Sequence, residues 1–152
     1  MIRCLEVALA IPDNEARTAL TTLQRLGIPL TGLERSDLYR CAVEEAEAES
    51  LAATFGSLET IYNPNKHVLR VRESAQPEPG EVWIDEIGSE VAGGNEAFVR
   101  VAGRTLPGVR SLERFTAWRL TVEPGRPAGA GVVVAATEAL LCNPAFQKAL
   151  RA

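Results

Sequence analysis

The side chains that could do acid–base or nucleophilic chemistry are few in this sequence. One histidine, His67, stands in the segment HVLRV beside Lys66 and near Arg70. A serine or cysteine nucleophile would have to reach it through long-range folding, and no G-x-S-x-G turn is present. We therefore interpret His67 as a strand or surface residue. We expect no catalytic residue and no catalytic activity of the chain's own.

The three cysteines, Cys4, Cys41 and Cys142, lie far apart and among apolar neighbours. An odd number at wide spacing is not a disulfide framework, and without a C-x-x-C pair no zinc site is expected. We interpret them as small buried hydrophobic residues. Free cysteines favour a reducing, cytoplasmic location.

Two further segments contain groups that bind ions in other proteins. The glycine-rich segment 125–137 precedes a helix pattern, where backbone N–H groups could hold a phosphate. It lacks the Lys-Ser or Lys-Thr and the strand of the nucleotide-binding motifs. The acidic run EEAEAES at 44–50 lacks the ligand spacing of calcium or zinc sites. We interpret the first as a connection and helix start and the second as a solvated loop, and expect no metal and no cofactor.

One segment of the chain occurs twice. LERSDLYRCAVE (33–44) and LERFTAWRLTVE (112–123) are identical at six of twelve positions, and Tyr39 matches Trp118. Apolar residues fall on alternate positions in both copies, which predicts strands with one face on a core. If Trp118 belongs to that core, its replacement by alanine costs about 3–5 kcal/mol.

Two shorter matches keep the same spacing. NEA begins at Asn14 and again at Asn95, and Asn-Pro occurs at 63–64 and 143–144. All three matches are 79 to 81 residues apart and in the same order. Such a period predicts two copies of a unit of about 80 residues.

Charged residues recur at matching positions of the repeated strand. They could form symmetric docking surfaces for a partner, or they could pair across neighbouring strands, where exposed ion pairs contribute little. Both interpretations remain open from the sequence. The candidates for a partner interface are Glu34, Arg35, Arg40, Glu113, Arg114 and Arg119.

The first copy shows a regular order of elements. Asp13 or Asn14 can cap the first helix and Gly27 can end it, while Asn63-Pro64 stops the second. The apolar stripe of the first helix is Ala16, Leu20, Leu23 and Leu26. The predicted elements are a strand at 3–11, a helix at 14–26, a strand at 33–44, a helix at 50–62 and a strand at 67–71.

The second copy repeats this plan. It has a strand in EVWIDEIG, a helix from about Asn95, the long strand, a helix near 131–142 and a last strand that is short or missing. The predicted fold is α+β, with two β-α-β-α-β repeats that form a pseudo-symmetric fused dimer and an antiparallel sheet with helices packed on one face. The predicted boundaries are 1–73 for the first repeat, 74–80 for the linker and 81–152 for the second repeat.

Size and charge narrow the classes of function. The chain has 152 residues, 24% of them charged, and a net charge of −4. This balance argues against a nucleic-acid partner, whose binding needs a basic surface. No run of eighteen apolar residues is present, so we expect no membrane association through a spanning helix.

Four of these segments together resemble a known family. They are RLGIPLTGLER and LETIYNPN in the first copy, and TLPGVRSLER and TEALLCNP in the second. The order of a helix ending in Leu-Gly, a strand opening with an arginine, and a helix ending before Asn-Pro resembles the PurS family. That family is the small subunit of phosphoribosylformylglycinamidine synthase, and one member is about as long as one repeat here.

The resemblance implies a non-catalytic subunit of purine biosynthesis. Such a subunit bridges a glutaminase subunit and an ATP-dependent synthetase subunit, which would be the partners, and self-association is a further expectation. A small-molecule-binding regulatory module with a tandem ferredoxin-like fold is the alternative, because such folds host many functions. An enzyme with a site between the halves, using His67 and an arginine, is a third interpretation.

Overall fold

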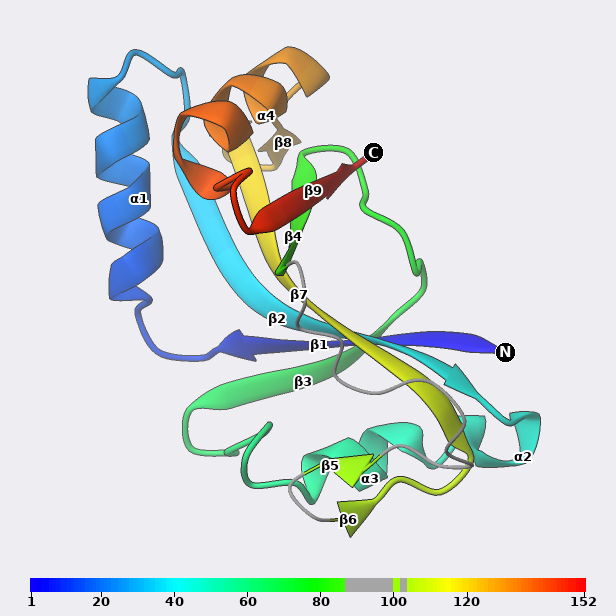
Figure 1. Cartoon of the computed structure of the whole chain (residues 1–152). Helices are drawn as coiled ribbons and strands as arrows, with labels where there is room; N and C mark the ends of the chain where they lie inside the picture. The colour runs from blue at the N-terminus through cyan, green and yellow to red at the C-terminus, as the bar shows by residue number, and fades with distance from the viewer. Residues whose placement is uncertain (87–99, 102–103) are drawn as a thin grey trace. The chain divides into compact units, whose positions relative to one another are not determined.

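The computed structural model describes residues 1–86, 100–101 (backbone alone) and 104–152, and it has an α+β fold (Figure 1). The helix predicted from about Asn95 lies outside these residues. The elements are β1 (Ile2–Leu9), α1 (Asn14–Arg25), β2 (Gly32–Val43), α2 (Glu45–Ala48), α3 (Leu51–Gly56), β3 (His67–Arg72), β4 (Glu81–Glu86), β5 (Arg100–Val101), β6 (Arg104–Thr105), β7 (Val109–Glu123), β8 (Arg126–Pro127), α4 (Ala130–Ala136), the π-helical turn η1 (Thr137–Leu141) and β9 (Gln147–Arg151).

Seven strands form the main sheet, in the order β3-β1-β2-β7-β4-β9, with β8 paired to β7. β1 pairs with β3, and β4 pairs with both β7 and β9, all antiparallel. The two repeated segments, β2 and β7, are neighbours in this sheet. The predicted α+β class with an antiparallel sheet is confirmed.

The chain divides into two compact units, and each takes segments from both halves of the sequence. β2 and β7 are long enough to contribute to both units, with the division at Asp37 in β2 and at Phe115 in β7. The predicted boundaries at 73 and 81 stay a prediction. Unit 1 comprises 1–11, 37–75 and the described residues from 100 to 114, and unit 2 comprises 12–36, 76–86 and 115–152.

The core of unit 1 lies between its strands and the short helices α2 and α3. Tyr39, Cys41 and Val43 alternate along β2 and point into this core, as the period of two predicts. The ring of Tyr39 packs against Phe55 of α3 with the centroids 5.5 Å apart. Leu5 of β1 completes the same face.

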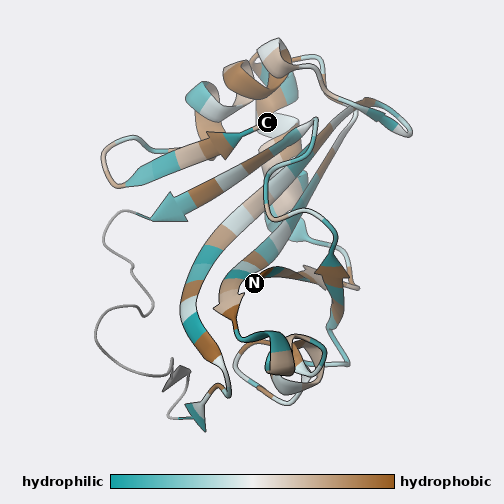
Figure 2. Cartoon of the chain, turned by 90° about the vertical axis from the view of Figure 1, so that its right-hand side faces the viewer, coloured by the Kyte–Doolittle hydropathy of each residue, from teal (hydrophilic) through white to brown (hydrophobic). Residues whose placement is uncertain are grey.

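The core of unit 2 lies between its strands and the helices α1 and α4. Leu33 of β2, Val82 of β4 and Leu120 of β7 belong to it, together with Leu23 of α1 and Val133 of α4. Figure 2 shows the alternation of polar and apolar residues along the strands that this packing requires. In each unit, therefore, helices cover the face of the sheet that the apolar alternation indicates.

The opposite face of the sheet is buried as well, which the period of two did not predict. Leu38 of β2 comes one residue before Tyr39, so its side chain points to the opposite face of the sheet. It is fully buried. In unit 2, Trp83 packs against Phe115 with ring centroids 5.5 Å apart, and both rings are almost completely buried. A strand buried on both faces loses its clear alternation, so the sequence pattern shows only the face with the longer apolar series.

Helix α1 begins at Asn14 as predicted and ends at Arg25, one residue before the predicted end. The carboxylate of Asp13 accepts hydrogen bonds from the backbone N–H groups of Glu15 and Ala16. Gly27 follows the helix with φ of +83°, a conformation that favours glycine. The predicted apolar stripe is wrong at Leu26, which is 59% exposed because it stands at the end of the helix, outside the core.

The second predicted helix differs from the observed one. The predicted helix at 50–62 corresponds to α3 alone, which ends at Gly56 and is followed by turns, so Asn63-Pro64 does not end it. Its apolar residues Leu51, Phe55 and Leu58 are buried as predicted. The acidic run at 44–50 was interpreted as a loop, but Glu45–Ala48 is helical. The last strand, β9, is present and pairs with β4. No helix in the described part of the chain is long and apolar enough to cross a membrane.

Candidate functional site

His67 has a structural partner, Asn63, in the turn that precedes β3. The backbone N–H of Asn63 donates a hydrogen bond to Nδ1 of His67, 2.9 Å away. In unit 2 the backbone N–H of Asn143 donates to Oε1 of Gln147, 2.8 Å away. In both turns the side-chain oxygen of the asparagine accepts a hydrogen bond from the backbone N–H of the residue two positions later. His67 therefore replaces a glutamine in a repeated turn, and this bond accounts for it without a catalytic role.

Four of the six predicted interface residues form two reciprocal ion pairs. Nε of Arg40 lies 2.7 Å from Glu113, and a second donor of the same guanidinium lies 3.1 Å from it. In unit 2, Arg119 lies 3.7 Å from Glu34 and 2.9 Å from Glu81. The cross-strand ion pairs, one of the two interpretations open from the sequence, are thus present.

The other two arginines stand near the matching aromatic residues. Arg35 donates to Asp13 over 3.0 Å and 3.1 Å and also pairs with Glu15. Its guanidinium carbon lies 5.9 Å from the ring centroid of Trp118, which fits a cation–π contact. Arg114 lies 3.4 Å from Asp37. All six candidates are therefore engaged within their own units, and their role toward a partner stays a prediction.

Burial changes the titration of two side chains beside this cluster. Burial raises the pKa of the Tyr39 hydroxyl, while the charge of Arg114 lowers it and that of Asp37 raises it. Burial, with Cys4 and Glu113 nearby, raises the pKa of the Cys41 thiol from 9.0 to about 12. A thiol of this kind stays protonated at neutral pH and is a poor nucleophile. Cys4 and Cys41 are buried, as predicted, and Cys142 is partly buried.

Two carboxylates are buried in the sheet, and both are paired. In unit 1, Glu6 accepts from Arg70 at 2.7 Å and lies 3.4 Å from Arg72. In unit 2, Glu81 accepts from the indole N–H of Trp83 over 3.2 Å and from Arg119. Buried charges persist only when they are paired in this way, so these carboxylates have structural partners. Among the described residues, no group of three His, Cys, Asp or Glu side chains is placed to hold a metal ion.

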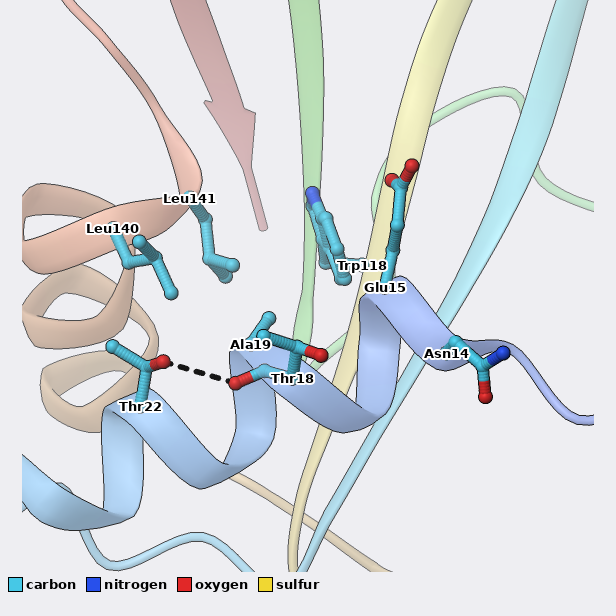
Figure 3. Close-up of a pocket in the computed structure, with 8 residues that line it drawn as sticks. All are labelled: Asn14, Glu15, Thr18, Ala19, Thr22, Trp118, Leu140 and Leu141. Carbon is cyan, nitrogen blue, oxygen red and sulfur yellow. Dashed lines mark hydrogen bonds between the residues drawn. The ribbon is translucent and has the colours of Figure 1, made fainter.

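One concave feature of unit 2 is an open cavity of about 460 Å³ that Trp118 lines (Figure 3). We call it the Trp118 cavity. Figure 3 shows Ala19, Leu140 and Leu141 around the open space, with Trp118 on β7 and the side chain of Glu15 extending from α1. Asn14, Thr18 and Thr22 of α1 complete the lining. The floor is therefore apolar and the rim polar, as in sites for small molecules.

No sequence pattern indicated this cavity, because its walls come from three distant segments. Trp118 was expected as a core residue, but it is only partly buried. Leu140 is 43% exposed, although it lies in an apolar run. Arg3, Ala48, Leu51 and Val71 are among the residues that line a smaller cavity of about 280 Å³ in unit 1.

No protein-family model matches the chain, and neither a curated protein nor a solved structure matches it.

Proposed function

We propose that the chain is a fused pair of two equivalent copies that acts as a non-catalytic subunit of phosphoribosylformylglycinamidine synthase. In this role it bridges the glutaminase subunit and the ATP-dependent synthetase subunit in the cytoplasm. The observation that carries the proposal is the reciprocity of the pairs Arg40–Glu113 and Arg119–Glu34. Exchanging the copies, by adding 79 to the first-copy number and subtracting 79 from the second-copy number, turns one pair into the other.

Reciprocal contacts are the property expected of a two-fold dimer. In such a dimer, residue i of one subunit contacts residue j of the other, and j contacts i in return. A duplicated chain keeps this pattern within one molecule. It also replaces an association that depends on concentration with one that does not.

The turns at Asn63 and Asn143 support the same proposal independently. Asn63 and Asn143 make the same three types of hydrogen bond in turns 80 residues apart. β1, α1, β2, the α2–α3 segment and β3 follow the β-α-β-α-β order of the first copy. β4, β7, α4 and β9 follow it in the second, apart from the residues that the structure does not describe.

A bridging role suits the chemistry of the charged residues. Arg40 and Arg119 pair with carboxylates of the sheet. Ammonia released by a glutaminase must reach the synthetase without loss to water, which requires the two enzymes to be held together. A rigid sheet can meet that requirement without reacting groups.

The test is a reconstitution with the glutaminase and synthetase subunits of the same cell. We expect the chain to bind both and to be required for turnover with glutamine as nitrogen donor. Turnover with added ammonia should not need it, because ammonia then bypasses the glutaminase. Failure to bind either subunit, together with unchanged glutamine-dependent turnover, would overturn the proposal.

A small-molecule-binding module is the second candidate, and the Trp118 cavity is the observation that favours it. This function predicts that a metabolite raises the melting temperature, because a ligand selective for the folded state stabilises it. It does not exclude the bridging role, since the cavity lies within unit 2 alone.

A further inference from the structure

The geometry points to a ligand class for the Trp118 cavity: a small amphipathic amine. Its apolar end would lie on the indole of Trp118, near Ala19 and Leu141, and its ammonium group would lie beside Glu15. This inference does not depend on the bridging function. It follows from the shape, the apolar floor and the charge of the cavity.

The size and the floor favour a small apolar group. A volume of about 460 Å³ is within the range of small-molecule sites, which begins at about 300 Å³. Leu140 is 43% exposed and Trp118 is only partly buried, so apolar surface in the cavity faces water. A ring or short alkyl chain placed there would cover this surface, and the burial stabilises the complex.

The charge around the cavity favours a cation. Among the described residues that line it, Glu15 alone carries a formal charge, and its side chain is 74% exposed. Arg35 stands next to it but pairs with both Asp13 and Glu15. These three side chains sum to one negative charge, which attracts an ammonium group and repels a carboxylate.

The rim also offers hydrogen-bond acceptors. The hydroxyl of Thr22 donates to the backbone carbonyl of Thr18 over 3.0 Å, so its oxygen is left to accept (Figure 3). Thr18 and Asn14 add a hydroxyl and an amide oxygen. An ammonium group has three donors and no acceptor, and therefore matches this rim.

The matching position in unit 1 is filled. Tyr39, which corresponds to Trp118 in the repeat, packs against Phe55 at 5.5 Å and is only 6% exposed. The two copies therefore differ at this point. The Trp118 cavity is a feature of the second copy alone at this position of the repeat.

Two probes with the same ring and opposite charge test the inference, namely 2-phenylethylamine and 3-phenylpropionate. The chain has two tryptophans, so the variant Trp83→Phe leaves Trp118 as the single one. Trp83 itself is fully buried. Tryptophan emission should change saturably with the amine. The carboxylate should bind about tenfold more weakly, because attraction by one exposed charge becomes repulsion.

Variants separate the cavity from the rest of the surface. Glu15→Gln should remove the preference for the amine, and Ala19→Leu should abolish binding of both probes by filling the space. Glu123→Gln removes an equal charge outside the cavity lining, and should change neither the preference for the amine nor the binding of the probes. Backbone amide shifts of Thr18 and Ala19 in the unaltered chain give a second readout if Trp83→Phe does not fold. Absence of a saturable change with the amine, or equal binding of the carboxylate, would overturn the inference.

Discussion

At the scale of single residues, the turn that recurs at Asn63 and Asn143 leads to a prediction about His67. Its imidazole accepts a hydrogen bond that Gln147 accepts in the other unit. His67→Gln should therefore keep the stability of the chain, while His67→Ala should lower it by about 1 kcal/mol through the lost bond. Urea unfolding of the two variants checks this. Equal losses in both would show that glutamine does not replace the imidazole as acceptor in this turn.

The two tryptophans should respond differently to replacement by alanine. Trp83 is fully buried against Phe115, so Trp83→Ala should cost about 3–5 kcal/mol. Trp118 is partly buried, and its loss should cost about half as much, since less surface leaves water on folding. Chemical denaturation measures both. A larger loss at Trp118 would place it in the core and contradict the open cavity.

The Cys41 thiol predicts a loss of stability at high pH. Its pKa is raised to about 12 in the folded chain, while the unfolded thiol ionises near its ordinary value of 9.0. Above pH 9 the unfolded chain therefore releases a proton that the folded chain keeps, and unfolding becomes more favourable with rising pH. This contribution is absent below pH 9. Tyr39, whose pKa is also raised, adds to the effect at higher pH.

The pH effect is measured by denaturant unfolding between about pH 8 and pH 11. The variant Cys41→Ala, which has no thiol at this position, should show a weaker decline than the unaltered chain. Identical pH profiles for the two chains would mean that the thiol ionises equally in the folded and unfolded states.

At the scale of elements, α1 depends on Asp13 in two ways. Its carboxylate caps the helix and also binds Arg35. Asp13→Ala should destabilise the chain by about 1–2 kcal/mol, while Asp13→Ser keeps a capping oxygen and should lose less. Thermal unfolding of both variants tests this. If Asp13→Ser is as damaging as Asp13→Ala, the contact with Arg35 matters more than the cap.

Element boundaries were predictable from the sequence in part, for identifiable reasons. Asp13 and Gly27 mark the ends of α1, which depend on local backbone chemistry, and the structure has them there. Asn63-Pro64 was predicted to stop the second helix, but α3 already ends at Gly56. The prediction was too long because the apolar spacing of Leu51, Phe55 and Leu58 continues through the turns after α3. Local spacing indicates which residues are buried more reliably than where a helix stops.

The candidate site was predictable only in part. Repetition pointed to Arg40 and Arg119, but whether they meet a carboxylate of the same chain depends on which strands are neighbours. The Trp118 cavity needs α1, β7 and η1 to lie around one space. No local pattern records such a gap, because the same apolar residues would fill a closed core equally well.

At the scale of the whole molecule, the reciprocal ion pairs should act alike if the copies are equivalent. Arg40→Ala with Glu113→Ala, and Arg119→Ala with Glu34→Ala, form two double-mutant cycles. Each should give a coupling of about 1 kcal/mol or less, because the carboxylates are largely exposed. A clear coupling in one cycle and none in the other would show that the pairs have diverged.

The claim that two copies form a fused pair is tested most directly by an experimentally determined structure of the chain. We expect β1, β2 and β3 to superpose on β4, β7 and β9 through a two-fold rotation. That rotation should place the turn at Asn63 on the turn at Asn143. It should also exchange the pair Arg40–Glu113 with the pair Arg119–Glu34. If no single rotation brings these elements together, the chain is not a duplicated module, and the proposed bridging function loses its structural basis.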